Sequence, residues 1–313
     1  MFDRIDAALA GARPVAIGHR IVHGGPELFH PVEIDPAVMA QLERATAFAP
    51  LHGPAALSLI RAAQAHYPDV PQVACFDTGF HQRLEEVAAI LPIPKEFRAD
   101  GVRRYGFHGL SCQSIVHQLG QDLPERLIIA HLGSGASVTA VRNGMSADTT
   151  MGLTPSGGIV MASRAGDLDP GLLLYLMRER GMDAADIEDM VDRRSGLLGI
   201  SGVSGDLRKL HAAAATNADA ALAIAVFCRS VAKQIAAMMV SLDGAEMIVF
   251  TGGIGENDAA VRSRICADLG WAGVPMDHAA TGGGVVVRVM ESQEGAEIAR
   301  AVLCLTDSAA GAG

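Results

Sequence analysis

The chain has 313 residues, of which 50% are hydrophobic, 19% charged and 4% aromatic, and its formal net charge is −10. The length and the apolar fraction allow a large buried core in one large or two medium domains, and they exclude a mainly disordered chain. The negative charge argues against binding of nucleic acid, which needs clustered basic side chains. We therefore expect local groups to hold any anionic ligand against an unfavourable overall field.

Lysine is scarce: Lys95, Lys209 and Lys233 are the lysines among 25 basic residues. No G-x-x-x-x-G-K-[ST] loop occurs, which excludes a Walker-type NTPase. The five cysteines form no C-x-x-C pair, which predicts mostly buried thiols in a reducing compartment. No signal-peptide pattern occurs, and two basic residues interrupt the apolar stretch 218–242, which favours a buried helix over a membrane span. The sequence predicts a cytoplasmic protein.

Helical and strand patterns alternate along the chain. In the first part we expect a helix at 3–10, a strand at 15–22, helices at 37–47 and 54–67, a strand at 70–76, and broken helices over 81–120. Three short strands follow at 127–131, 136–142 and 145–148, then helices to about 194, a helix at 218–242, strands at 247–251 and 285–290, and a last helix from Glu294. The alternation predicts an α/β fold with mixed sheets.

Two clusters place charged residues beside glycine at predicted strand ends. Arg20 lies in Gly-His-Arg-Ile-Val-His-Gly-Gly, where a guanidinium could bind a planar carboxylate through two hydrogen bonds or form a structural ion pair within the sheet. Asp77 follows the strand at 70–76, at the end where open α/β sheets bind ligands. For such an Asp taken by itself, capping of the next helix is the commoner role.

Further candidate groups lie in glycine-rich loops. His108, between Phe107 and Gly109, could donate a hydrogen bond to a developing oxyanion, or it could be a satisfied core histidine. Backbone amides of such loops can bind phosphates without lysine, and a helix that starts after Glu256 would add its dipole. Dinucleotide-binding and zinc-helix patterns are incomplete, and no G-x-S-x-G elbow occurs.

Together these segments resemble the acetate kinase family, within the acetate and sugar kinase, Hsp70 and actin superfamily. The resemblance is carried by GHRIVHGG, APLHGP, CFDTGFH, RRYGFHG, HLGSGAS, DTTMGLTP, SRAGDLDPG, SGLLGISG, GDLR and FTGGIGEN, in this order. It implies a two-domain actin-like ATPase fold, with an N-terminal acyl-substrate domain at 1–80 that the helix at 296–313 completes, and a nucleotide-binding domain at 81–295.

The resemblance also implies reversible transfer of the γ-phosphoryl group of ATP to acetate, giving acetyl phosphate and ADP. It implies catalytic roles for Asp77, His108 and Arg164. It implies that Arg20 binds the carboxylate of acetate and that His52 is a further active-site histidine. It implies a pocket for the methyl group that is formed by Val22, Leu51, Phe107 and Pro155. The nucleotide segments are His131, Leu132, Gly133, Ser134 and Gly135, then Asp206, Leu207 and Arg208, then Gly253, Ile254, Gly255, Glu256 and Asn257, and Glu294 matches a magnesium-linked glutamate.

The resemblance further implies Mg²⁺ or Mn²⁺ as cofactor and a homodimer. Because a carboxylate substrate is already ionised at neutral pH, Asp77 is expected to orient the cation or water and not to accept a proton. We expect Arg20, Arg164, His108, His131 and the cation to supply positive charge for in-line transfer.

The sequence departs from the family pattern in several places. The family's N-x-G-S-S-S phosphate loop has no counterpart before GHRIVHGG, which predicts either a start upstream of Met1 or a shortened form. Ser134 stands for a usual Asn, and Gly295 for the second Glu of the metal motif. Two alternatives remain: a propionate or butyrate kinase, which Val22 disfavours because it is bulky, and a non-catalytic nucleotide-binding paralogue.

Overall fold

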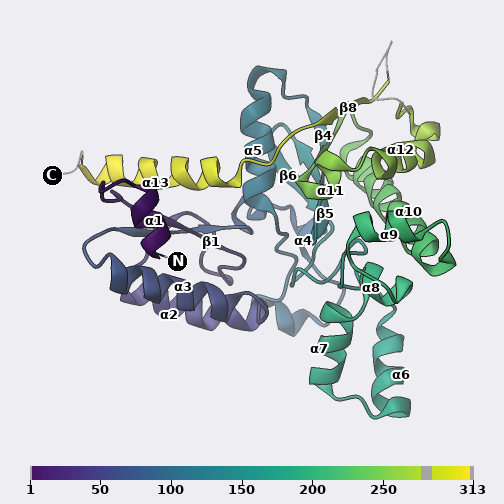
Figure 1. Ribbon diagram of the computed structural model, residues 1–313, viewed down its shortest axis with the longest axis horizontal. Helices are drawn as coiled ribbons and strands as arrows, with labels where there is room; N and C mark the ends of the chain where they lie inside the picture. Colours follow the sequence, from purple (N-terminus) through teal and green to yellow (C-terminus); the bar gives the residue numbers. More distant parts are fainter. Residues whose placement is uncertain (1, 276–283, 311–313) are drawn as a thin grey trace.

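The computed structural model describes residues 2–275 and 284–310, and they form two lobes, each built on one sheet (Figure 1). The sheet of the first lobe has the order β1-β3-β2, with β1 parallel to β3 and β2 antiparallel to it. Its strands are β1 (Ile17–Ile21), β2 (Val32–Glu33) and β3 (Gln72–Phe76), and its helices are α1 (Phe2–Ala8), α2 (Pro36–Ala45), α3 (Gly53–His66) and α13 (Glu294–Ala310).

The second lobe has a five-stranded mixed sheet with the order β6-β5-β4-β7-β8. The strands β4 (Arg126–Leu132), β5 (Ala136–Arg142) and β6 (Met145–Thr149) form an antiparallel meander, whereas β7 (Met247–Thr251) and β8 (Val286–Val289) run parallel to β4. Its helices are α4 (Glu86–Ala89), α5 (Gly109–Leu119), α6 (Pro170–Arg180), α7 (Ala184–Arg193), α8 (Gly196–Ser201), α9 (Leu207–Ala213), α10 (Ala218–Leu242), α11 (Gly252–Asn257) and α12 (Ala259–Asp268). Short 3₁₀ helices lie at Thr46–Phe48, Gly79–His81, Lys95–Arg98, Gly120–Asp122 and Gly270–Ala272.

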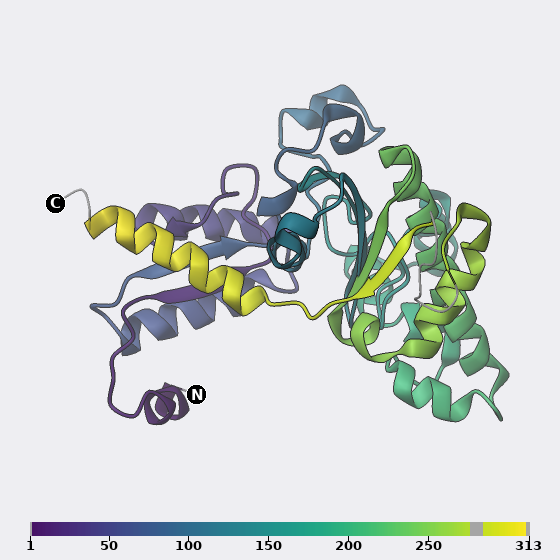
Figure 2. The same cartoon turned by 90° about the horizontal axis from the view of Figure 1, so that it is seen from above.

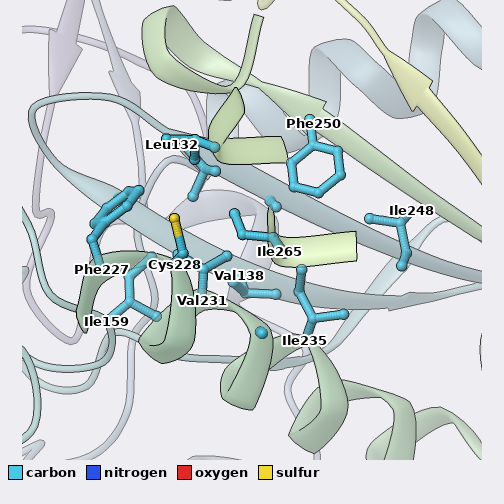
Figure 3. Packing of buried hydrophobic residues seen from close by; sticks show 14 of the residues in the cluster. Leu132, Val138, Ile159, Phe227, Cys228, Val231, Ile235, Ile248, Phe250 and Ile265 are labelled. Atoms are coloured by element: carbon cyan, nitrogen blue, oxygen red, sulfur yellow. The ribbon is translucent and has the colours of Figure 1, made fainter. Parts of the chain in front are cut away.

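Helix α10 forms the core of the second lobe. Its apolar residues recur with a helical period, so that one face packs against β4, β5 and β6 while the other carries residues such as Leu222 and Val240 that are exposed. Figure 3 shows Phe227, Val231 and Ile235 of this face directed at side chains from the sheet and from α12. By length and composition alone α10 could cross a membrane, but half of its most apolar window is buried within the fold.

Two helices connect the lobes. Figure 2 shows α13 leaving the second lobe after β8 and lying along the sheet of the first, where it packs on β1, β3 and α5. Val302 of α13, Leu110 of α5 and Val73 of β3 share one small apolar cluster. Helix α13 thus returns the chain to the first lobe, and the division at residues 80 and 296 stays a prediction.

The strands and long helices confirm the predicted mixed α/β class, and residues 218–242 form one helix as predicted. The sequence did not predict β2, α8, α9 or α11. Helix α11 was missed because its first residues are glycines, which disfavour helices. Gly252 there has a φ of +77°, and a Cβ would lie 2.8 Å from the carbonyl oxygen of Leu132. The close approach of the start of α11 to the end of β4 therefore requires glycine.

We expect Phe227→Ala to lower the free energy of unfolding by about 3–5 kcal/mol, because it leaves a cavity at a fully buried position of α10. Leu222→Ala on the same helix is the matched control. Leu222 is 53% exposed, so we expect a change within about 0.5 kcal/mol. Urea unfolding followed by circular dichroism measures both, and equal effects would contradict the role given to α10.

Candidate active site

Arg20 and Asp77 meet because β1 and β3 are parallel neighbours and both residues lie at the carboxyl ends of these strands. The Asp77 backbone N–H donates to the Ile21 carbonyl at 2.9 Å, which continues the ladder one step past β3. The Arg20 guanidinium donates from Nε to Asp77 Oδ1 at 3.0 Å and from Nη2 to Oδ2 at 2.7 Å. Asp77 is 1% exposed and therefore forms a buried ion pair instead of capping the following turn.

Glu294 completes the group from the start of α13. Arg20 Nη1 lies 3.0 Å from Glu294 Oε2, so one guanidinium joins two carboxylates from segments far apart in sequence. Burial raises the pKa of Asp77 and of Glu294, and the charge of Arg20 opposes both shifts. Burial by itself would lower the pKa of Arg20, but Asp77 and then Glu294 raise it overall. The sequence left open whether Arg20 binds a substrate carboxylate or forms a structural ion pair, and the structure shows it in an ion pair.

His108 has an unusual backbone and a stacked partner. Its φ of +56° lies in the left-handed region, which a non-glycine residue rarely adopts, and it directly precedes α5. Its ring stacks on that of His131 with centroids 4.2 Å apart. Ser137 Oγ lies 3.0 Å from Nδ1 of His108, and Ser111 Oγ lies 2.8 Å from Nδ1 of His131. If each hydroxyl donates, each ring carries its proton on Nε2.

The pKa of both histidines lies below its ordinary value, which argues against the expectation that they supply positive charge. Burial, followed by the charge of His131, lowers the pKa of His108 well below 6.5, and Arg20 and Arg164 act in the same direction. Burial and then Arg20 lower the pKa of His131 to about 4. A charged imidazole would lose its hydration there beside permanent cations. The lowered pKa values favour a role for these rings as neutral hydrogen-bond donors.

Arg164 supplies the second guanidinium. Its Nη1 donates to the Pro155 carbonyl at 3.3 Å, and its Nη2 lies 3.1 Å from His52 Nε2, which must accept because arginine has no acceptor. Burial lowers the pKa of His52, and Arg164 lowers it further, so this imidazole is neutral. Burial also lowers the pKa of Arg164, with Asp192 opposing that shift.

The predicted methyl-pocket residues are only partly brought together. Val22 and His52 line an enclosed cavity of about 20 Å³, together with small side chains such as Ala45 and Ala49. Phe107 is 1% exposed and does not line this cavity. Leu51 and Pro155 also lie outside its lining, although the Pro155 carbonyl holds Arg164.

The predicted nucleotide segments converge on one open cleft of about 780 Å³ between the β4–β5 turn, α9 and α11. Of the predicted residues, the lining contains Gly133, Ser134, Asp206, Leu207, Arg208, Gly253, Ile254 and Asn257. The remaining ones lie elsewhere. Leu132 is a core residue, Gly255 is buried, and the Glu256 carboxylate accepts from the Gly252 N–H at 2.9 Å. His131 is one of the two stacked imidazoles and Gly135 lies beside them, and neither residue lines the cleft.

The sequence did not single out several polar residues of the site. Ser111 lies one helical turn after His108, a spacing that could have suggested it, and its hydroxyl also meets Ser292 Oγ at 2.9 Å. At the edge of the cleft, His211 Nε2 and Asp258 Oδ2 lie 2.9 Å apart, a contact that links α9 to the N-cap of α12. No local pattern marks that pair, because it forms only across the tertiary structure.

Comparison with known proteins identifies the family. The acetokinase family model matches residues 7–303. This chain belongs to the acetokinase family. An acetate kinase of Nitrobacter hamburgensis is 47% identical over 268 residues, which cover 84% of this chain and 66% of that relative. An acetate kinase of Thermosynechococcus vestitus is 45% identical, over 91% of this chain and 73% of the relative. The chain thus spans about two thirds to three quarters of the length of these relatives.

Solved structures agree with the family. A propionate kinase from Francisella tularensis superposes with a TM-score of 0.90 at 36% identity, covering 96% of this chain and 83% of that one. An acetate kinase from Porphyromonas gingivalis gives a TM-score of 0.86 at 36% identity, covering 93% and 78%. The α/β fold with two lobes is therefore the fold of these kinases.

We expect the free energy of unfolding to fall as the pH is lowered from about 6.5 towards 4. The native pKa of His131, and that of buried His81, is about 4, whereas the unfolded value is near 6.5, so the unfolded chain binds more protons in this window. Urea unfolding at stepped pH measures the slope, and ring ¹⁵N shifts give the pKa of each histidine. A native pKa of His131 near 6.5 would contradict the neutral assignment.

Proposed function

We propose that this chain transfers the γ-phosphoryl group of ATP reversibly to acetate. The observation that carries the proposal is the position of Gly135, next to the nucleotide cleft. A Cβ there would lie 3.3 Å from His108 Nε2 and 3.4 Å from Arg164 Nη1, so the absence of a side chain lets the backbone of this loop approach two donors closely. Phosphate oxygens are the ligands that suit these donors, because an imidazole N–H and a guanidinium both donate to them.

The transfer needs positioning and charge stabilisation more than covalent help from the protein. A carboxylate oxygen of acetate attacks the γ-phosphorus, the new O–P bond forms, and the bond from the γ-phosphorus to the bridging oxygen breaks with its electron pair going to ADP. The acid has a pKa of about 4 to 5, so no proton is removed. Arg164 bears a permanent charge for the equatorial oxygens, and neutral His108 donates from Nε2.

Asp77 and Glu294 suit a magnesium or manganese ion. Both are carboxylates that face one cation, the Arg20 guanidinium, and Mg²⁺ usually binds one or two carboxylates together with substrate phosphates and waters. In the described part of the chain no group of three or more potential ligand side chains occurs, which fits such an open site and not a closed protein cage. When bound, the cation would neutralise phosphate charge. Asp77 and Glu294 would hold and orient it.

The acid is proposed to be acetate because Val22, which lines a cavity of about 20 Å³, is bulky, and a longer acid would need a smaller residue there. A propionate kinase is among the similar structures, so propionate remains the alternative substrate. A non-catalytic nucleotide-binding role is the alternative outside this class. It would bind ATP in the cleft without forming product.

We also propose that the protein forms a homodimer in the cytoplasm. Figure 1 shows α6 and α7 projecting side by side from the second lobe. Helix α6 has no buried residue, and it exposes Leu172, Leu174, Tyr175 and Met177, an apolar group that a monomer would leave in water. The thiols of the buried cysteines support a reducing compartment.

The proposed activity is tested by incubating the purified chain with ATP, Mg²⁺ and acetate and trapping acetyl phosphate as the hydroxamate. We expect product, and we expect Arg164→Ala to lower kcat by about 10²–10³-fold, the usual loss for one donor to transition-state charge. Arg98→Ala, at an exposed position of a 3₁₀ helix, is the control and should leave kcat unchanged.

Three outcomes separate the alternatives. Higher kcat/KM with propionate than with acetate would change the substrate. ATP binding without any product would favour the non-catalytic role. Activity of Arg164→Ala equal to that of the parent chain would remove Arg164 from the site.

For the dimer, we expect Leu174→Glu to shift the mass measured by light scattering from dimer to monomer, because it places a charge within the apolar group of α6. Val240→Glu is the control, since Val240 is 79% exposed on α10, away from this group. A parent chain that is monomeric at micromolar concentration would exclude the proposed dimer.

A further inference from the structure

Two carboxylates already use three of the five N–H groups of the Arg20 guanidinium. Its Nε and Nη2 donate to Asp77 and its Nη1 lies 3.0 Å from Glu294. The acetate that the proposed function assigns to Arg20 would be a third carboxylate beside one guanidinium. A guanidinium pairs best with a single carboxylate through two parallel hydrogen bonds, so acetate would compete with Asp77 and Glu294 for Arg20, and a carboxylate that loses Arg20 is left unpaired.

The unpaired carboxylate is costly at this place. Asp77 is 1% exposed, and a buried carboxylate without its partner loses both its ion pair and its hydration. A divalent cation would compensate Asp77 and Glu294, and it would thereby release Arg20 for the substrate. Arg20 can make this move because its side chain is 41% exposed, whereas the Asp77 backbone is held at both its N–H and its carbonyl.

We propose that Arg20 acts as an internal cation that competes with the divalent metal for Asp77 and Glu294, so that the metal and the carboxylic acid substrate bind cooperatively. This inference rests on the proposed function, in which both ligands use this site. Without metal, Arg20 stays on the two carboxylates and the acid binds weakly. With metal, Arg20 is free and the acid binds well. Because the coupling is an equilibrium property, the acid must tighten the metal by the same factor.

The expected effect of removing Arg20 on metal binding is unusual for an arginine of an active site. In Arg20→Gln the competitor is gone, so we expect Mn²⁺ to bind about tenfold more tightly than to the parent chain, the gain expected if the competent state is populated about a tenth of the time. Mn²⁺ added alone, without nucleotide, is the probe, and the free ion is counted by electron paramagnetic resonance. Circular dichroism checks the fold of each variant, and Arg20→Lys, which keeps a charge, is expected to bind Mn²⁺ less tightly than Arg20→Gln.

Arg164→Gln is the matched control. It removes the same charge from the same site, but the contacts of Arg164 are with His52 and the Pro155 carbonyl and not with the two carboxylates. We expect its Mn²⁺ affinity to stay within about threefold of that of the parent chain, since only long-range repulsion is lost. Equal tightening in both arginine variants would overturn the competition and leave a general charge effect.

Acetate provides the second arm. Saturating acetate, against chloride of equal ionic strength, should tighten Mn²⁺ binding to the parent chain about tenfold and should have no effect in Arg20→Gln. An Mn²⁺ affinity of the parent chain that acetate does not change would overturn the proposal. The formation of acetyl phosphate by the parent chain is measured separately, so a failure of the coupling and a failure of the proposed activity are distinguishable.

Discussion

The active site depends on one arrangement, in which the Arg20 guanidinium lies between Asp77 and Glu294. Burial raises the pKa of both carboxylates, and the charge of Arg20 beside them favours their anionic form. The arrangement also ties the lobes together, because Arg20 and Asp77 end strands of the first sheet, whereas Glu294 begins the helix that returns from the second lobe. Packing of α13 on β1 and β3 therefore sets the geometry of the charged group.

Around this group, burial affects the charge of arginine and histidine side chains differently. Arg20 and Arg164 keep their charge because guanidinium is too basic to lose it, while the same buried surroundings keep His108 and His131 neutral. Two neutral imidazoles can stack closely, whereas two imidazolium ions would repel each other. The site therefore presents its positive charge through arginines and leaves its histidines to donate single hydrogen bonds.

Most of the secondary structure could be predicted from sequence because its patterns are local. Helix α10 can be recognised from the helical period of its apolar residues over 25 positions, and the turn between β5 and β6 from Asn143-Gly144. The misses were elements whose local sequence argues against them. Helix α11 starts with glycines, and β2 has two residues that are held only by the neighbouring β3. Such elements form because of tertiary contacts, so they cannot be predicted from a short stretch of sequence.

The sequence by itself determined the family, since the ordered motifs around Arg20, Asp77, His108 and Arg164 identify it, and these motifs supplied the candidate residues of the site. The tertiary structure decided their charge state and their partners. Only the fold buries His108 and His131 and so removes their charge, and only the return of α13 brings Glu294 to Arg20. Burial and long-range ion pairs depend on how close segments far apart in the chain come to each other. No single sequence motif gives that information.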